Sequence, residues 1–455
     1  MTAELVEKIR DIVGDAGMIG PDAIAERATS YWDPSPMRGK LLVRPESTAA
    51  VSAILKSCHA ARQSVVVQGG LTGTVEGAVG TPDDILLSLE KMTSIEFIDE
   101  VEGVAVVQAG AILESVQNEL AGRGFLFPLD LGARGSCTIG GTVATNAGGI
   151  NVLRYGMVRN LVLGLEAVLP DGTVISSMQQ MLKNNTGYDL KQLFIGSEGT
   201  LGIVTRVAIR LFPLPTSRQT VLAAAGSFDD VIGFLNRLKA GLPGTLSAYE
   251  VMWNNYYHDV TGERGHRAPL ERDFPFYIIA EAEGADEEAD AAQFEKLLTA
   301  AFESGQLADA VVAKSGAERK ALWAVREDFE AVLPAYLYDV SLPIRHMTTY
   351  VERLNKRVQA EWPGATAYIF GHIADGNLHL FTTPYDDGVH REISDAIVYG
   401  CLDGLDGSVS AEHGIGREKK AWLPATRSAA ELELMRTLKV TLDPQNILNP
   451  ENILF

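Results

Sequence analysis

Glycine is concentrated in one part of this 455-residue chain. The sequence holds 44 glycines, and the densest runs lie between Gly69 and Gly202. The first run, QGGLTGT at 68–74, directly follows Val65-Val66-Val67, a short apolar segment typical of a buried strand. Glycines there permit a sharp turn and let backbone N–H groups converge on an anion such as a pyrophosphate. The spacing matches neither the Rossmann nor the Walker pattern, and alone it fits a plain glycine turn equally well.

A second run is harder to explain as a turn. PLDLGARGSCTIGG at 128–141 is followed by ATNAGG at 144–149, and together they hold six glycines in 22 residues. A packed core has little use for so many residues without side chains, whereas close approach of the backbone to a large flat ligand explains them. A third run, NTGYDLKQLFIGSEGTLGI, spans 185–203.

These three runs resemble the FAD domain of the vanillyl-alcohol-oxidase type, also called the PCMH fold. Within it the likeness is to the FAD-linked D-2-hydroxy-acid dehydrogenase family, most of all its D-2-hydroxyglutarate dehydrogenase branch, and it covers nearly the whole chain. The resemblance implies an α+β fold with a PCMH-type FAD-binding domain of two α+β subdomains at 1–215. An α+β substrate- and metal-binding cap domain would follow at 216–415, and a C-terminal helical segment at 416–455 would pack back on the FAD domain.

The resemblance also implies how FAD is held. The 68–74 loop and the 135–141 segment would wrap the pyrophosphate and the ribityl chain, while Asn146 and Gly148-Gly149 would lie beside the isoalloxazine. Some relatives attach FAD covalently through a histidine in the first loop, where this chain has Leu71, so we expect non-covalent binding. On the adenosine side, the likeness places Glu198, Gly199 and Ile203. The full set of implied cofactor-binding residues is Gly69, Gly70, Thr72, Gly73, Thr74, Pro128, Asp130, Gly135, Ser136, Thr138, Ile139, Gly140, Asn146, Gly148, Gly149, Glu198, Gly199, Ile203 and Asn449.

The charge balance limits the partners. Lys and Arg number 39 and Asp and Glu number 59, so the formal net charge is −20. Nucleic acid and anionic lipid would repel such a chain, and no apolar stretch approaches the ~20 residues that span a bilayer. The N-terminus has helical periodicity rather than a signal-peptide pattern, and Cys58, Cys137 and Cys401 form no paired framework. We therefore expect a cytoplasmic protein without a transmembrane segment or a nucleic-acid partner.

Apolar spacing predicts the local structure. Ser47 or Thr48 can cap a helix that continues to Cys58. Strands are predicted at 65–67, 85–89, 104–108, 161–169 and 202–211, and Phe212-Pro213-Leu214-Pro215 closes that series and marks a domain boundary. Beyond it, helices at 228–239, 287–304 and 349–362 with strands at 276–282 and 366–373 predict an α+β domain with helices on one sheet face, and 429–442 is predicted to be helical.

Two of the eight histidines lie in GHIADGNLHL at 371–380. Asp-Gly flanked by apolar residues is a strong signal for a two-residue hairpin turn. With Asp375-Gly376 as the turn, His372 faces His379, and directly opposed residues have Cβ atoms about 4.5–5.5 Å apart. Both imidazoles could then bind one ion, although a three-residue turn would break this register.

The segment SAEHG at 410–414 adds a carboxylate and a third histidine. Two imidazoles and one carboxylate suit zinc with an open coordination position, and manganese or ferrous iron accept similar ligands. The spacing alone also fits a hydrogen-bonded structural histidine pair. The family holds a divalent metal with matching segments, so the resemblance implies His372, His379 and Glu412 as ligands and His413 as the catalytic base.

The segment LWAVRE at 322–327 resembles the family's L-W-x-x-R-E, whose arginine binds the substrate carboxylate. The resemblance assigns this role to Arg326, a task that suits a planar guanidinium; the alternative is a surface ion pair. Three implied substrate-binding positions depart from the D-2-hydroxyglutarate dehydrogenase pattern. Glu330 replaces threonine, Leu337 replaces lysine and Phe381 replaces asparagine. A 2-hydroxy acid with a neutral, apolar or cationic side chain is therefore a rival to the dicarboxylate.

The sequence thus predicts an FAD- and metal-dependent dehydrogenase that oxidises a D-2-hydroxy acid to the 2-oxo acid by hydride transfer to FAD. The substrate most like that of the family branch is 2-hydroxyglutarate, and the alternative is a D-lactate- or glycolate-type monocarboxylic acid. An oxidase that uses O₂, or a flavin-binding subunit of a larger oxidase complex, are further alternatives. The resemblance suggests an electron-transfer flavoprotein or a quinone as electron acceptor, and a homodimer.

Overall fold

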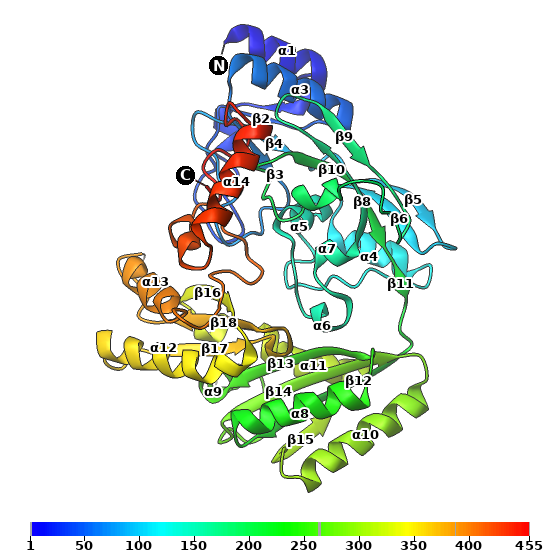
Figure 1. Ribbon diagram of the computed structural model, residues 1–455, viewed down its shortest axis with the longest axis vertical. Helices are drawn as coiled ribbons and strands as arrows, with labels where there is room; N and C mark the ends of the chain where they lie inside the picture. The colour runs from blue at the N-terminus through cyan, green and yellow to red at the C-terminus, as the bar shows by residue number, and fades with distance from the viewer. Residues whose placement is uncertain (1, 263–264, 387, 455) are drawn as a thin grey trace. The chain divides into compact units, whose positions relative to one another are not determined.

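The structure is a computed structural model that describes residues 2–262, 265–386 and 388–454. Its contacts divide the chain into two compact units, and their elements are labelled in Figure 1. The first unit runs up to Gly149, continues from Gly156 to Leu214, and resumes at Glu412. The second unit comprises Ile150–Tyr155 and Pro215–Ala411.

The first unit contains a four-stranded sheet in the order β1 (Met18–Ile19), β2 (Leu41–Val43), β4 (Ile85–Ser88) and β3 (Val65–Gln68). Strand β4 is parallel to both β2 and β3. The predicted helix at Ser47 is confirmed as α3 (Thr48–Ala61), because the Ser47 side chain accepts the N–H of Ala50 and the apolar positions are buried. Helix α3 contacts α1 (Ala3–Val13), which the N-terminal periodicity predicted.

A five-stranded antiparallel sheet forms the other half of the first unit. Its order is β5 (Ile95–Asp99), β6 (Val104–Gln108), β10 (Ile203–Arg210), β8 (Val162–Val168) and β9 (Val174–Ser177). These bounds confirm the strands predicted at 104–108, 161–169 and 202–211. The remaining elements of this half are α4 (Leu113–Ala121), β7 (Phe125–Leu126), α5 (Ile139–Thr145), α7 (Val158–Leu161) and β11 (Phe212–Pro213), while α2 (Pro21–Ile24) precedes β2.

The C-terminal part of the chain belongs to the first unit. Helix α14 (Ala429–Leu442) has the predicted bounds, and it is capped by Ser428 and Glu431 in a reciprocal pair of hydrogen bonds. Beyond it, Leu448 forms an isolated parallel bridge with Val65 at the start of β3. The chain end therefore lies along the strand that leads into the first glycine-rich loop.

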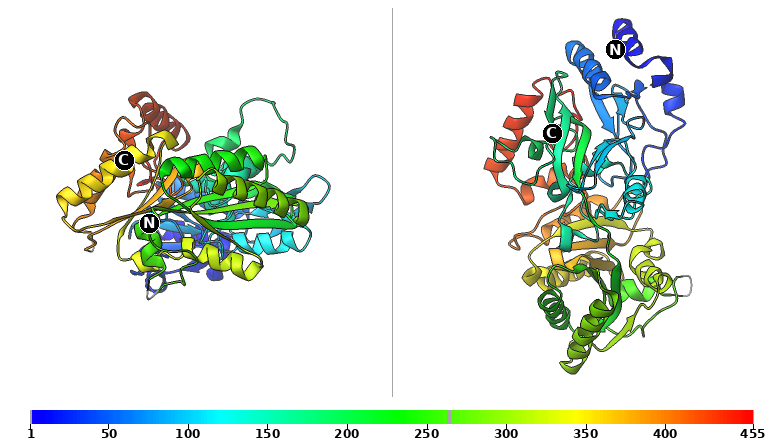
Figure 2. Two further views of the ribbon diagram at one scale, coloured as in Figure 1. Left: turned by 90° about the horizontal axis from the view of Figure 1, so that it is seen from below. Right: turned by 90° about the vertical axis from the view of Figure 1, so that its right-hand side faces the viewer.

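The second unit is built on a seven-stranded sheet in which every neighbouring pair is antiparallel. Its order is β15 (Asp309–Val312), β12 (Ser217–Ala225), β14 (Phe276–Gly284), β13 (Leu246–Trp253), β17 (Ala367–Gly371), β18 (Asn377–Thr382) and β16 (Tyr336–Ser341). Its helices are α6 (Val152–Tyr155), α8 (Phe228–Gly241), α9 (Asn254–Val260), α10 (Glu287–Glu303), α11 (Gly316–Glu327), α12 (Met347–Glu361) and α13 (Arg391–Gly400). Figure 2 shows the strands and helices of this unit from two further directions.

Helices cover both faces of this sheet, so the prediction of helices on one face is wrong. On one face, Phe234 of α8 packs against Tyr249 of β13. On the other face, Trp323 of α11 and Tyr256 of α9 share a buried cluster with Met252, which lies three residues after Tyr249 in β13. Successive side chains of a strand point to opposite faces. Because β13 is buried at seven of its eight positions, both faces need a cover.

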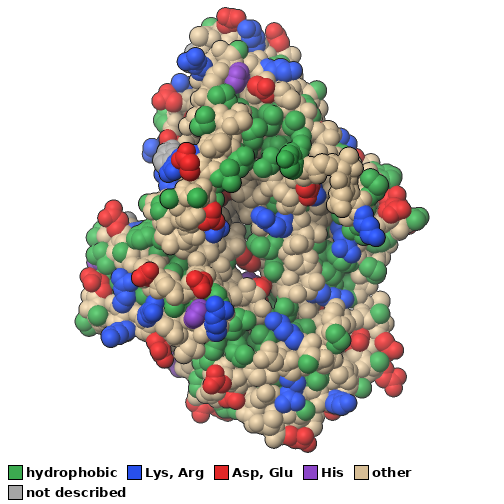
Figure 3. Space-filling model, in the orientation of Figure 1, with side chains coloured by type: hydrophobic (Ala, Val, Ile, Leu, Met, Phe, Trp, Pro, Cys, Tyr) green, Lys and Arg blue, Asp and Glu red, His purple; other side chains and the backbone are tan. Residues whose placement is uncertain are grey.

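Charge is dispersed rather than gathered. On the face shown in Figure 3, acidic and basic side chains are interspersed, although the chain carries a net charge of −20. Among the described residues, no helix combines the length and the apolar character needed to cross a bilayer.

Candidate active site

The first two glycine-rich runs lie in contact. A Cβ on Gly70 would lie 2.1 Å from the carbonyl oxygen of Ser136, and one on Gly69 would lie 2.7 Å from Thr138 Oγ1. In the same loop the Thr74 hydroxyl is buried and has no hydrogen-bond partner among the described residues. A buried hydroxyl normally finds a partner. A phosphate oxygen of a bound dinucleotide would supply one, so this loop fits the pyrophosphate of FAD.

The glycine pair Gly148-Gly149 forms a second close approach. A Cβ on Gly149 would lie 2.0 Å from the carbonyl oxygen of Asp130, and one on Gly148 would lie 2.4 Å from Glu412 Oε1. That oxygen accepts the Gly149 N–H at 2.7 Å. Glu412, the predicted metal ligand, is therefore fixed against the backbone that the resemblance places beside the isoalloxazine.

Glu198 and Asn449 hold the C-terminal part of the chain. The buried Glu198 carboxylate accepts the N–H groups of Ile415 and Gly416, both at 2.7 Å. Burial raises the pKa of Glu198, although these two N–H groups and the charge of Lys419 act against that rise. The Asn449 side chain accepts from the Val67 N–H at 2.9 Å and donates to the Glu198 carbonyl at 2.7 Å. Since His413 is two residues before Ile415, these contacts fix the segment that carries the predicted base.

The other predicted FAD residues lie along or beside the same runs. Ile139 and Gly140 begin α5 after Thr138, whose side chain caps that helix. Asn146 ends α5 in the left-handed conformation and accepts the Arg159 N–H at 3.0 Å. The positions that complete the set are Thr72 and Gly73 in the first loop, Pro128, Asp130 and Gly135 in the second run, Gly199 in the third run and Ile203 at the start of β10. Their contacts with FAD stay predictions.

His372 and His379 approach each other in the second unit, but not through the predicted register. His379 of β18 faces Phe370 of β17, so the predicted His372–His379 pairing is wrong. Residues 373–375 form a short 3₁₀ turn closed by Gly376 at φ 91°. Because this turn is longer than the predicted one, His372 lies outside the ladder between β17 and β18. The imidazole ring centroids are still 5.2 Å apart, at an interplanar angle of 77°.

A buried carboxylate joins His372 to Arg326. Glu250 of β13 accepts from His372 Nδ1 at 2.5 Å through Oε1 and from Arg326 Nε at 2.8 Å through Oε2. Burial alone would raise the pKa of Glu250, but the attraction of His372 and Arg326 and their hydrogen bonds hold it below its ordinary value. The Arg326 guanidinium also lies over the Phe370 ring, 4.6 Å from its centroid. Its terminal Nη groups are the donors that can meet a substrate carboxylate.

A second buried carboxylate, Asp339 of β16, faces His379 across the β16–β18 ladder. It accepts the Ala411 N–H at 2.8 Å and the Ser410 hydroxyl at 3.4 Å. Ala411 is the residue directly before Glu412 in the chain. Asp339 thus anchors, within the second unit, the segment that leads into the predicted carboxylate ligand.

Apolar side chains continue the sheet face that carries the histidines. Phe381, two residues beyond His379, faces Leu337 across the β16–β18 ladder. Its ring packs edge-on against the rings of Phe329 and Phe370, with distances between ring centroids of 5.4 and 5.2 Å. Phe381 is buried, whereas Leu337 and Phe329 are partly exposed. The structure therefore brings Arg326, His372, His379, Leu337 and Phe381 together on one face of one unit.

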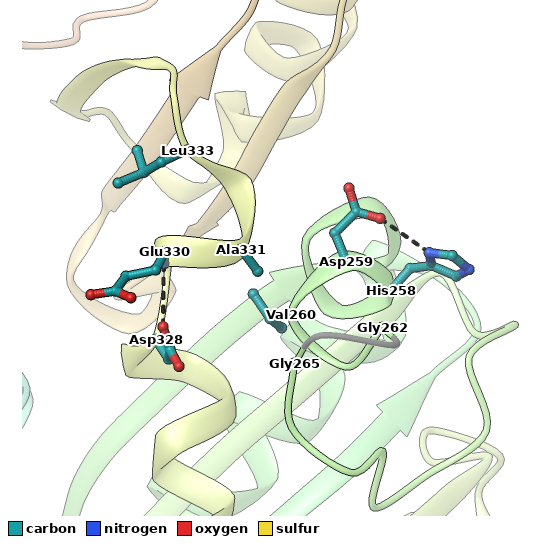
Figure 4. A pocket seen from close by; sticks show the side chains of 9 residues that line it. All are labelled: His258, Asp259, Val260, Gly262, Gly265, Asp328, Glu330, Ala331 and Leu333. Atoms are coloured by element: carbon teal, nitrogen blue, oxygen red, sulfur yellow. Dashed lines mark hydrogen bonds and ion pairs between the residues drawn. The ribbon is translucent and has the colours of Figure 1, made fainter.

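The remaining predicted substrate-binding residue, Glu330, directly follows Phe329 in the chain. It is exposed and lines a pocket with Asp259, Asp328 and His258, shown in Figure 4. Tyr368 donates to Asp259 beside that pocket at 2.7 Å. None of the other predicted site residues is among the described residues that line the pocket. A role for Glu330 in substrate binding stays a prediction.

Sequence reasoning missed Glu250 and Asp339. Each is the one charged residue that its strand buries at the site: Glu250 stands in LSAYEVMW and Asp339 in YLYDVS. Buried carboxylates are almost always paired. A lone acid within an apolar strand was the available signal for both.

Comparison with known families accounts for most of the chain. The family model described as FAD linked oxidases, C-terminal domain, matches residues 214–453, and the FAD binding domain matches residues 39–177. The chain is 41% identical to D-2-hydroxyglutarate dehydrogenase of Bos taurus, over 91% of this chain and 77% of that protein. It is 38% identical to D-2-hydroxyglutarate dehydrogenase of Arabidopsis thaliana, over 99% of this chain and 81% of that protein.

Solved structures show the same fold. The substrate-bound p-cresol methylhydroxylase matches with a TM-score of 0.74 at 16% identity, covering 99% of this chain and 96% of that one. The predicted α+β, PCMH-type architecture is thereby confirmed. The chain belongs to the FAD-linked oxidase family. Within that family it is an FAD-dependent D-2-hydroxy-acid dehydrogenase.

The expected cytoplasmic location is wrong. The relatives from Bos taurus and Arabidopsis thaliana are named as mitochondrial enzymes, which contradicts that expectation. The three cysteines that suggested cytosol are free and buried, and burial raises the pKa of Cys58 and of Cys137 to about 12. Such thiols are unreactive because of their surroundings, so they carry no information about the compartment.

Proposed function

We propose that the protein is a metal-dependent dehydrogenase whose ion is held by His372, His379 and Glu412. The observation that carries this proposal is the hydrogen bond from His372 Nδ1 to the buried Glu250. Metal-binding histidines almost always donate their second ring N–H to a carboxylate, carbonyl or water. With Nδ1 engaged in this way, Nε2 of His372 would be the ligand atom.

The donor set favours zinc and also accepts manganese or iron. Each of the three residues can offer one ligand atom, two imidazole nitrogens and one carboxylate oxygen. Asp339 holds Ala411 in the second unit, and Glu412 follows it by one peptide bond. When bound, such an ion would lower the pKa of the substrate's 2-hydroxyl group.

FAD would be held without a covalent bond by the glycine-rich runs at 68–74 and 135–141, together with Asn146, Gly148 and Gly149. The unpaired buried hydroxyl of Thr74 and the cradle at Gly69 and Gly70 support this assignment. When bound, FAD supplies the acceptor for the hydride that leaves C2 of the substrate.

The protein's own residues would bind the acid and take its proton. Arg326, fixed through Nε by Glu250, presents its Nη groups to the substrate carboxylate. His413 removes the hydroxyl proton as general base. The C2 hydrogen leaves with its electron pair, and the product is the 2-oxo acid.

The substrate proposed first is D-2-hydroxyglutarate, on which the relatives act by name. A monocarboxylic D-2-hydroxy acid with an apolar side chain is the second candidate. It is favoured by Leu337 and Phe381, which face each other beside His379 and offer neither charge nor hydrogen bond. From the family likeness we propose an electron-transfer flavoprotein or a quinone as the electron acceptor, and a homodimeric assembly.

Anaerobic bleaching of the flavin absorbance tests the reaction itself. Purified, FAD-loaded protein is mixed with matched pairs of D- and L-2-hydroxy acids, both mono- and dicarboxylic. We expect rapid bleaching by at least one D-enantiomer and none by its L-partner. If no 2-hydroxy acid reduces the flavin, the proposed function is wrong.

A further inference from the structure

Glu250 contacts two functional side chains that come from different elements. Its residue is 1% exposed, and both carboxylate oxygens are used: Oε1 by His372 Nδ1 at 2.5 Å and Oε2 by Arg326 Nε at 2.8 Å. Arg326 lies in the last turn of α11, and His372 lies in the turn between β17 and β18. One carboxylate therefore links the proposed metal ligand to the proposed substrate-binding arginine.

The sheet register explains how Glu250 reaches both. Val251 of β13 pairs with Gly371 of β17, so Glu250 stands beside the point where the chain leaves β17 at His372. Two further contacts hold Arg326 in place. Its guanidinium lies over the Phe370 ring, and Tyr256 donates to its carbonyl oxygen at 2.9 Å. An ionised carboxylate is expensive to bury without partners, and here both partners belong to the proposed reaction site.

The neighbouring strand provides a comparison. Glu281 of β14 is 2% exposed and accepts from Arg319 at 2.5 and 2.6 Å and from Trp323 Nε1 at 3.0 Å. Like Glu250, it is a buried carboxylate paired with an arginine of α11. Arg319 and Trp323 are neither predicted metal ligands nor the predicted substrate arginine. Glu281 is therefore a matched buried carboxylate–arginine pair, to which Glu250 adds the contact with His372.

We propose that Glu250 is a positioning residue that couples the metal site to the substrate-carboxylate site. By accepting from Nδ1–H it fixes the His372 tautomer in which Nε2 is the ligand atom. By accepting from Nε–H it fixes the direction in which Arg326 presents its Nη groups. This inference rests on the metal-dependent function proposed above.

Glu250→Gln separates the two contacts. A glutamine has one acceptor oxygen and one NH₂ donor, so it cannot accept from both His372 Nδ1–H and Arg326 Nε–H. It also leaves Arg326 without its buried counter-charge. Loss of such an outer partner typically weakens metal binding 10–100-fold, and we expect that range for zinc. Binding of a 2-oxo acid should weaken in the same variant, because Arg326 is no longer held in place.

The experiment measures zinc affinity of the FAD-loaded protein by competition with a coloured chelator. The wild type is compared with Glu250→Gln, Glu250→Asp and Glu281→Gln. A second readout is the affinity for a 2-oxo acid, followed by the flavin spectrum without added substrate. We expect Glu250→Gln to weaken both affinities, and Glu281→Gln to lower the melting temperature while leaving both unchanged. In Glu250→Asp the side chain is shorter by one methylene and cannot reach both partners, so this variant should also weaken zinc binding. It replaces Glu250→Gln in the test if the glutamine variant does not fold.

The outcomes separate two failures. If either Glu250 variant binds zinc and the 2-oxo acid as tightly as the wild type, the positioning role is wrong and the metal site stands. If Glu281→Gln weakens zinc binding as much as Glu250→Gln, general loss of a buried acid explains the effect and the inference is overturned. If the wild type binds neither zinc nor manganese, the metal-dependent function itself is wrong.

Discussion

Replacing Leu337 by lysine is expected to raise activity with a dicarboxylic D-2-hydroxy acid relative to a monocarboxylic one. Leu337 faces Phe381 on the sheet face that carries His379. Phe381 lies two residues beyond His379, and two residues along a strand span about 6.6–6.8 Å. If the 2-hydroxyl of the substrate is held near the histidines, the far end of the substrate's side chain therefore lies beside Leu337 and Phe381. A carboxylate there would meet Leu337, Phe381 and Phe329 without a hydrogen-bond donor among them.

The magnitude follows from that contact. A charged group that loses its hydrogen-bond partner on burial costs about 1.5–3 kcal/mol, which corresponds to roughly 10–150-fold in kcat/KM. A terminal methyl in the same place gains about 0.8 kcal/mol from burial. Leu337→Lys should therefore raise the ratio of kcat/KM for D-2-hydroxyglutarate over that for D-2-hydroxypentanoate by at least about 10-fold relative to the wild type.

The assay compares kcat/KM for these two acids, which have equal chain lengths, with an artificial electron acceptor. Leu333→Lys is the matched control, because Leu333 is an exposed leucine that lines the separate pocket of Figure 4. It should leave the ratio unchanged. An unchanged ratio in Leu337→Lys would refute the reasoning, since the far end of the substrate would then not lie beside Leu337 and Phe381.

Further outcomes follow from the base, the thiols and a buried ion pair. His413→Ala should keep its FAD but reduce the rate of flavin bleaching by substrate about 10²–10⁴-fold; a near-normal rate would mean that another group is the base. Burial raises the pKa of Cys58 and of Cys137 to about 12, so a thiol reagent at pH 8 should label them only after unfolding, and fast labelling of the native protein would contradict their burial. Burial alone would raise the pKa of Glu281, but Arg319 and its hydrogen bonds hold it below the ordinary value of 4.5. A carboxyl whose folded pKa is depressed stabilises the fold above its unfolded pKa and loses that effect as pH falls through the folded value. The melting temperature should therefore fall below about pH 4.5, and more steeply than in Glu281→Gln; equal slopes would show that this pair contributes nothing.

The elements that the sequence predicted well are those whose patterns are local. Ser47 caps α3 and Ser428 caps α14. Each serine hydroxyl accepts a hydrogen bond from the backbone N–H three residues later, and this contact does not depend on where the helix packs. The glycine runs were also readable, since the crowding at Gly70 and Gly149 admits no side chain. Such constraints act within a few residues and survive any tertiary arrangement.

The features that escaped prediction depend on contacts between distant strands. The Asp375-Gly376 signal indicated a tight hairpin, but residues 373–375 form a 3₁₀ turn that moves the register by two positions. The partners of Glu250 lie 76 and 122 residues away in sequence. No spacing rule reaches that far, so only the fold reveals that Arg326 and His372 share one carboxylate.

The most direct test of the central claim is flavin reduction by a D-2-hydroxy acid after removal of divalent metal. FAD-loaded protein is treated with a chelator, its retained flavin is checked by absorbance, and anaerobic bleaching is followed before and after zinc or manganese is restored. We predict that the metal-free protein keeps its FAD, is reduced at least about 100-fold more slowly, and recovers when the ion is returned. Unchanged bleaching by protein shown to be free of metal would contradict a metal site at His372, His379 and Glu412.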